Sequence, residues 1–101
     1  MVKHVILWKL KAEITGEKKA EVLNGIKENL EALKGVVPGL VEIKVNCEKV
    51  LSSSNADLML DSTLESAEAL KGYAVHPAHV AAADGYVRPY TEVRLCLDYE
   101  L

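Results

Sequence analysis

The fold of this chain is decided by an alternating stretch near its start, residues 2–11, which reads VKHVILWKLK. Successive side chains of a β-strand point to opposite faces, so every second residue of the stretch shares a face. One face carries Val2, His4, Ile6, Trp8 and Leu10, and the other carries Lys3, Val5, Leu7, Lys9 and Lys11. The middle of the second face, Val5 and Leu7, is apolar as well. This pattern predicts a strand that is covered on both sides.

The first half of the chain continues with a helix and two further strands. Helical spacing predicts a helix over 15–34, with Thr15 as its N-cap and Gly35 as its stop. Its apolar stripe comprises Leu23, Ile26, Leu30 and Leu33. A Pro38-Gly39 turn leads into a strand over 40–47, and a short strand over 56–61 follows a serine-rich loop. Alternation in the 40–47 strand groups Val41, Ile43, Val45 and Cys47 on one side.

The second half contains a broken helix and a last strand. Ser62 and Glu65 have the spacing of a capping box, which predicts a helix from there to about residue 71 or 72. Pro77 suits the first position of a second helical piece that runs to about Arg88. A strand over 91–99 closes the chain. The order β-α-β-β-α-β predicts an α+β, ferredoxin-like fold with a four-stranded antiparallel sheet, as one domain over residues 1–101.

One layer of helices covers only one face of such a sheet. The other face would carry Val5 and Leu7, which favour burial over contact with water. The simplest partner is a second copy of the chain, so we predict a homodimer in which Val5 and Leu7 lie at the interface. The two sheets would then pack face to face.

Charge and hydropathy narrow the classes of function. The formal net charge of −3 argues against a nucleic-acid binder and against an anionic membrane surface. The chain has no apolar run of about 18 residues, and its first residues lack a signal-peptide pattern, so we expect a cytoplasmic location. Cys47 and Cys96 are widely spaced, and we expect both to be buried free thiols.

The segment from Tyr73 to His79, YAVHPAH, is the candidate for chemistry. Histidine exchanges a proton near neutral pH, and a nearby tyrosine can donate a hydrogen bond to a developing oxyanion. Each residue also has a plain structural interpretation. His76 would cap the helix that Pro77 begins, His79 and Tyr73 would pack at the edge of the core, and His4 would be a hydrogen-bonded core histidine. No acidic residue stands beside the histidines in sequence, so we expect no metal site.

The opening strand with its histidine, the tetrapeptide His76-Pro77-Ala78-His79 and the closing Asp98-Tyr99 resemble the stress-responsive α/β-barrel (Dabb) domain family. The resemblance covers nearly the whole chain. It implies a dimer of ferredoxin-like subunits whose sheets face each other to form a dimeric α/β barrel. One branch of the family, similar to plant olivetolic acid cyclase, closes a linear polyketide without a cofactor. On that resemblance Tyr73 and His79 match the catalytic pair, and His4 matches a histidine of the first strand.

Three functions are open at this point. The first is a small dimeric Dabb protein of uncharacterised role that binds a small apolar molecule. The second is a cofactor-free cyclase-like or lyase-like enzyme that acts on a carbonyl compound, with His79 as general base and Tyr73 as oxyanion partner. The third is a haem or quinol monooxygenase of the dimeric α/β-barrel class. In each case the candidate contacts of the ligand are His4, Ile6, Trp8 and His76.

Overall fold

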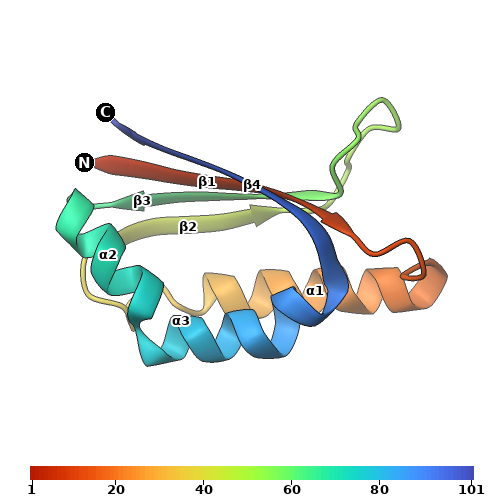
Figure 1. The fold of residues 1–101 in the computed structure, drawn as a ribbon, viewed down its shortest axis with the longest axis horizontal. Helices are drawn as coiled ribbons and strands as arrows, with labels where there is room; N and C mark the ends of the chain where they lie inside the picture. The colour runs from red at the N-terminus through yellow and green to blue at the C-terminus, as the bar shows by residue number, and fades with distance from the viewer.

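Four strands form one antiparallel sheet in the order β2-β3-β1-β4. The computed structural model describes all residues, 1–101, and Figure 1 shows its elements. The strands are β1 (Val2–Leu10), β2 (Leu40–Asn46), β3 (Leu58–Leu64) and β4 (Thr91–Glu100). The helices are α1 (Gly16–Glu31), α2 (Ala67–Val75) and α3 (Pro77–Ala82), which continues as a π-helical turn η1 (Ala83–Val87) and a 3-10 turn η2 (Arg88–Tyr90). The predicted ferredoxin-like β-α-β-β-α-β order is confirmed.

The helices lie on one face of the sheet, and the core fills the space between the two layers (Figure 1). β1 is central because it pairs with β3 on one side and with β4 on the other. Its helix-facing residues Val2, His4, Ile6, Trp8 and Leu10 are all buried, as the alternation predicted. The helix α1 packs Val22, Ile26 and Leu30 onto them. Val22 replaces Leu23 in the predicted stripe, because Leu23 is only partly buried at the margin of the core.

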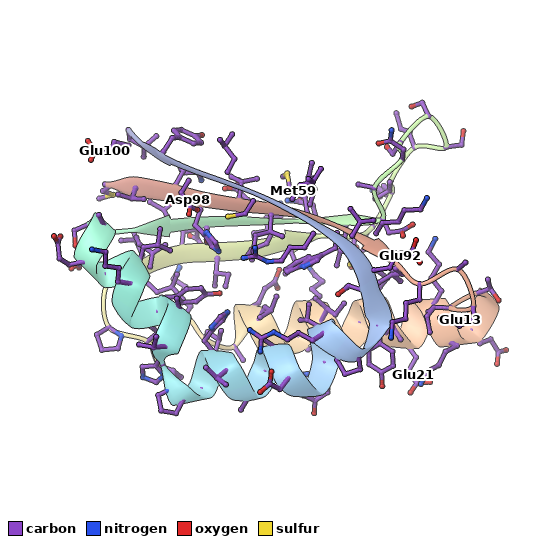
Figure 2. The ribbon with its side chains drawn as sticks, in the orientation of Figure 1. Glu13, Glu21, Met59, Glu92, Asp98 and Glu100 are labelled. Atoms are coloured by element: carbon purple, nitrogen blue, oxygen red, sulfur yellow. The ribbon has the colours of Figure 1, made fainter.

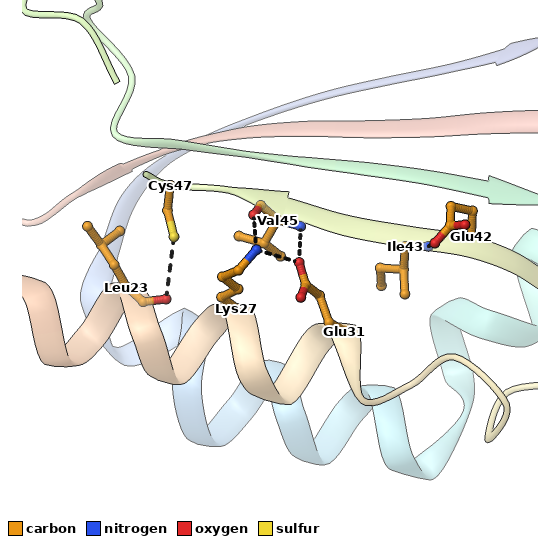
Figure 3. Close-up of polar contacts among 7 residues, drawn as sticks. All are labelled: Leu23, Lys27, Glu31, Glu42, Ile43, Val45 and Cys47. Carbon is orange, nitrogen blue, oxygen red and sulfur yellow. Dashed lines mark hydrogen bonds and ion pairs between the residues drawn. The ribbon is translucent and has the colours of Figure 1, made fainter. Parts of the chain in front are cut away.

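Side chains of α1 close the outer edge of β2 (Figure 3). The Glu31 carboxylate accepts a hydrogen bond from the Val45 N–H at 2.9 Å, and Lys27 Nζ donates to the Val45 carbonyl at 3.0 Å and to Glu31 at 2.8 Å. Burial opposes the charge on Glu31, but these hydrogen bonds outweigh it and lower the pKa of that carboxyl. Backbone groups that would face solvent at an edge strand are thereby satisfied.

Two local predictions were wrong at the β3–α2 junction: the helix cap at Ser62 and the end of the strand at residue 61. Ser62 is not a helix cap, because β3 continues through it to Leu64, where the strand still pairs with β1 and β2. Ser62 is fully buried and donates a hydrogen bond to the His4 carbonyl at 2.7 Å. The cap of α2 is Ser66, whose hydroxyl accepts from the Ala69 N–H at 3.0 Å. Since sheet pairing protects more backbone groups than one cap does, the strand prevails over the capping pattern.

Four further expectations need correction in whole or in part. Val41 is exposed, because a register shift between Leu40 and Glu42 moves it off the buried side of β2. Cys47 is half-buried and Cys96 is exposed, so the two thiols are free but not both buried. Thr15 stands at the N-cap position of α1, as predicted, but its side chain makes no cap hydrogen bond. The helix predicted through Arg88 changes to a π-helical turn at Ala83, where the N–H of Arg88 bonds to the Ala83 carbonyl five residues back.

The second face of the sheet carries no element of this chain. Figure 2 shows Met59 on this face, turned away from the helices. Pairing places Leu7 opposite Met59 on one side and opposite Leu95 on the other, so these residues lie on the same face. The exposed apolar side chains of β4 belong to it too: Val93, Leu95, Leu97 and Tyr99. We call this surface the open face. No helix of the protein has the length and apolarity needed to cross a membrane.

The turn that precedes β2 provides a test of the fold. Gly35 and Gly39 both have positive φ, +85° and +80°, and only at Gly39 would an added Cβ meet the Ala69 Cβ, at 2.6 Å. We expect Gly35→Ala to lower the free energy of unfolding by roughly 1–2 kcal/mol through backbone strain. Gly39→Ala should cost about 1–3 kcal/mol more because of the clash with α2. Urea denaturation of the two variants measures this difference, and equal losses would contradict the packing of the turn against α2.

Candidate functional site

The break between α2 and α3 brings Tyr73 and His79 together. Tyr73 lies near the end of α2, and His79 lies in the first turn of α3. Between them His76 is extended, with φ −63° and ψ 131°, so the chain changes direction before Pro77 starts the new helix. The two rings come to rest with their centroids 4.2 Å apart and tilted by 37°. A single uninterrupted helix would space these residues differently.

His76 itself is a helix cap. Its Nδ1 accepts a hydrogen bond from the Ala78 N–H at 3.1 Å. Its surroundings are a separate shallow hollow beside the Pro38-Gly39 turn. The structure therefore places His76 away from Tyr73 and His79, although all three stand in one heptapeptide.

His4 extends the group from the sheet. Its ring lies 5.8 Å from the Tyr73 ring, edge to face, and it is buried. Its Nδ1 lies 2.5 Å from the Asp98 carboxylate, which is its register partner on β4. Sequence reasoning did not place an acidic residue beside a histidine, because the two stand at opposite ends of the chain. Only the pairing register of the first and last strands could have indicated it.

A small cavity lies against Tyr73 and His79, between the sheet and the helical layer. Its volume is about 80 Å³ and it opens to solvent, enough for several waters at about 10–15 Å³ each. The predicted contacts Ile6 and Trp8 line it, whereas His4 packs beside Tyr73 and is not part of the wall. Sequence reasoning missed the rest of the wall: Leu30, Leu60, Ala83, Val87, Arg88, Thr91 and Arg94.

A larger hollow of about 440 Å³ lies on the outer surface, between α1 and the π-helical turn. It has no histidine or cysteine in its wall, and polar residues such as Asn24 and Glu28 dominate it. We therefore place the candidate site in the smaller cavity, where titratable and apolar groups converge.

Burial governs the protonation of the cavity's two titratable rings. Tyr73 is 1% exposed, its hydroxyl is buried with no hydrogen-bond partner, and burial raises its pKa to about 12. Burial also lowers the pKa of His79, with the nearby Arg88 acting in the same direction. The His79 Nδ1 lies 3.3 Å from the Ala74 carbonyl. Since a carbonyl can only accept, Nδ1 carries the proton, and Nε2 retains its lone pair. At neutral pH the site therefore holds a neutral imidazole beside a protonated phenol.

A second group of ligand-type side chains comprises His4, Cys96 and Asp98, whose donor atoms all lie within 4.8 Å of one another. His4 and Asp98 are hydrogen-bonded at 2.5 Å, and the Cys96 thiol is 3.5 Å from the same carboxylate. Two ligands of one tetrahedral zinc ion would lie about 3.3 Å apart, from bond lengths near 2.0–2.1 Å. This group could hold a cation only if the His4–Asp98 bond opened.

The fold and the cavity define a ferredoxin-like protein in which buried Tyr73 and half-buried His79, both from the helical layer, line a cavity against the sheet. The family model of the Stress responsive A/B Barrel Domain matches residues 2–101, and the chain belongs to this family. Olivetolic acid cyclase from Cannabis sativa is 34% identical over 101 residues, which cover 97% of this chain and 94% of the cyclase.

Two solved structures place the fold among its relatives. A dimeric protein of unknown function with a ferredoxin-like fold from Bacteroides fragilis is 34% identical, with a TM-score of 0.91 over 99% of this chain and 95% of that one. A hydroxynitrile lyase from Passiflora edulis shares the fold at 18% identity, with a TM-score of 0.71 over 97% of this chain and 90% of the lyase. The predicted family and fold are confirmed.

The lowered pKa of His79 has a consequence for stability. Below the ordinary histidine pKa of about 6.5, the unfolded chain binds a proton that the folded chain resists. The contribution of neutral His79 to the free energy of unfolding is therefore complete above pH 6.5. It is lost as the pH falls through the lower pKa that His79 has in the folded protein. We expect wild type to lose more unfolding free energy than His79→Gln when pH drops from 7.5 to 5. Urea denaturation at the two pH values measures this, and parallel losses in both proteins would contradict the burial of His79.

Proposed function

We propose that this protein catalyses a cofactor-independent proton transfer at a carbon next to a carbonyl, as in an intramolecular aldol cyclisation, with His79 as general base and Tyr73 as hydrogen-bond donor. The observation that carries the proposal is the pairing of the two rings, 4.2 Å apart, in the wall of one cavity. One ring offers a free Nε2, and the other offers a hydroxyl that no protein group engages.

The chemistry uses these groups in turn. His79 Nε2 takes a proton from a methylene that two carbonyls acidify. The resulting carbanion attacks a second carbonyl carbon of the same molecule, and a carbon–carbon bond forms. Tyr73 donates a hydrogen bond to the oxygen on which negative charge develops, and the imidazolium then returns the proton to that oxygen. With a pKa of about 12, Tyr73 remains a donor throughout the neutral range.

The unpartnered hydroxyl of Tyr73 supports this role. A buried hydroxyl without a partner costs about 1–3 kcal/mol, and a substrate oxygen would supply the missing acceptor. The apolar wall formed by Ile6, Trp8 and Val87 suits the carbon skeleton of the substrate, which would displace water from the reacting atoms on binding. The enclosed volume of about 80 Å³ admits a short reacting segment, and the remainder of the substrate would lie at the opening.

The relatives support the same reaction class. The protein from Cannabis sativa is a cyclase by name and matches along nearly the whole chain. The enclosed volume of about 80 Å³ is smaller than a haem group, which argues against the haem form of the monooxygenase interpretation and leaves its quinol form to the activity assay. A ligand-binding module without catalysis would use the same cavity, and the activity assay below separates it from an enzyme.

We also propose that the open face binds a second copy of this chain, so that two sheets pack face to face. Leu95 and Leu97 are 63% and 62% exposed there, and Leu7 and Val5 lie beside them. An apolar surface of this extent on one side of a sheet favours burial against another protein. The Bacteroides fragilis relative, 34% identical, is described as dimeric.

The catalytic proposal is tested with short 3,5,7-trioxo thioesters and the corresponding acids. We expect wild type to convert at least one of them to a cyclic product faster than buffer does, as followed by ultraviolet absorbance and mass spectrometry. Tyr73→Phe and His79→Gln should each lower the rate about 100-fold or more.

The matched control is Tyr86→Phe, because Tyr86 is a half-exposed tyrosine outside the cavity and should leave the rate unchanged. Tyr73→Phe should also keep or raise the free energy of unfolding, since it removes an unpaired buried hydroxyl. Unchanged rates in both cavity variants, or a wild-type protein that binds these compounds without turnover, would refute catalysis by this pair.

The dimer proposal is tested by sedimentation velocity. We expect wild type at micromolar concentration to sediment at twice the 11.0 kDa chain mass. Leu7→Glu and Leu95→Glu should shift it to the monomer, because a charge would be buried at the interface. Val75→Glu is the matched control, since Val75 is an exposed apolar residue at the end of α2, away from the sheet. A monomeric wild type, or dimeric Leu7→Glu and Leu95→Glu proteins, would contradict the proposal.

A further inference from the structure

We infer that Arg94, assisted by Arg88, forms a carboxylate-binding subsite at the opening of the cavity, so that the ligand of this site is an oxo-acid rather than a neutral carbonyl compound. The carboxylate-binding site is argued from the positions of the two arginines alone. Only its role in turnover rests on the proposed function. The inference identifies the chemical class of the ligand, which the tyrosine–histidine pair alone leaves open.

Arg94 reaches the cavity through the register of the sheet. It pairs with Trp8 across the β1–β4 ladder, so its side chain leaves the sheet on the helical side, as that of Trp8 does. The register shifts between Lys9 and Leu10, and past this shift Thr91 also lines the cavity. A bulge of this kind changes where neighbouring side chains point and is frequent beside functional sites. Arg88 arrives from the other layer, at the start of the 3-10 turn.

The two arginines differ in their charge partners. Arg88 forms an ion pair with Asp84, one helical turn earlier. Arg94 has no carboxylate within 4.0 Å, although the chain as a whole is acidic, with a net charge of −3. Arg88, the only other arginine of the chain, is thus neutralised in part. Arg94 is the cation without a carboxylate partner in a mostly apolar wall.

The guanidinium group suits one class of anion. Its planar fork presents parallel N–H donors that match the two oxygens of a carboxylate, and such charge-assisted pairs are about twice as strong as neutral hydrogen bonds. Both arginines also act on His79, since each lowers its pKa through its charge. A carboxylate held at the opening would therefore fix one end of an oxo-acid while its carbonyl carbons extend inward to Tyr73 and His79.

A purely structural role for Arg94 would be to cover Trp8 with its apolar stem. That role requires no carboxylate on the ligand. Comparing a charged ligand with a neutral one of the same shape therefore distinguishes it from carboxylate binding. Benzoate and benzamide have nearly the same shape and differ in charge. Trp8 is the only tryptophan of the chain and lines the cavity, so its fluorescence reports occupancy directly.

We expect wild type to bind benzoate at least tenfold more tightly than benzamide, with the preference falling as salt is added. Arg94→Gln should abolish the preference, and Arg94→Lys should retain part of it. The matched control is Lys9→Gln, which removes one positive charge from the neighbouring position on the opposite face of the sheet and should keep the preference. The inference would be overturned if wild type bound the two probes equally or bound neither at millimolar concentration. It would also be overturned if the preference for benzoate survived in Arg94→Gln.

The same titration separates this inference from the catalytic proposal. Tyr73→Phe retains both arginines, so it should keep the benzoate preference even if the protein has no cyclase activity. The converse outcome is that trioxo thioesters turn over as fast as the free acids, with both rates unchanged in Arg94→Gln. That result would leave the proposed catalytic pair in place and refute the carboxylate subsite.

Discussion

The pairing of the first strand with the last strand is the constraint on which the rest of this structure depends. It joins the two ends of the chain, with β1 inside the sheet and β4 at its edge, and extends from Val2 opposite Glu100 to Leu10 opposite Thr91. That register sets His4 beside Asp98 and Trp8 beside Arg94. The helical layer then supplies Tyr73 and His79 to the same side. A slip of one residue would turn every one of the β4 side chains to the opposite face.

The last strand serves two surfaces at once. Leu95, Leu97 and Tyr99 point to the open face, whereas Arg94, Cys96 and Asp98 share the helical side with His4 and Trp8. This division follows from strand geometry, since neighbouring side chains leave a sheet in opposite directions. Because one backbone carries both sets, tight packing of the open face against a partner would also hold Arg94 in position. Assembly and ligand binding are therefore expected to be coupled through β4.

How far the sequence predicted the structure depended on the range of the interactions involved. The alternation of β1, the order of elements and the break at Pro77 are local features, and all three were predicted from neighbouring residues. The capping pattern at Ser62 misled because a long-range ladder outcompetes a local cap. Asp98 and Arg94 could not be placed, since their neighbours lie about ninety residues away in the chain and depend on the register of β4. Which of Tyr73, His76 and His79 point into a cavity could not be predicted either, because the change of direction at Pro77 decides which ring faces Tyr73.

The energetics of Tyr73 argue that its hydroxyl has a purpose beyond the fold. The side chain is among the largest fully buried ones, and its ring packs between His4 and His79. Those contacts require only the ring. The hydroxyl adds a desolvation cost that no protein group offsets, and burial prevents it from ionising in the neutral range. A protonated, desolvated donor beside a neutral imidazole is costly for a free protein, yet it is the arrangement needed when charge develops on a bound carbonyl oxygen. A ligand oxygen that accepts this hydrogen bond would offset that cost, which agrees with the donor role proposed for Tyr73.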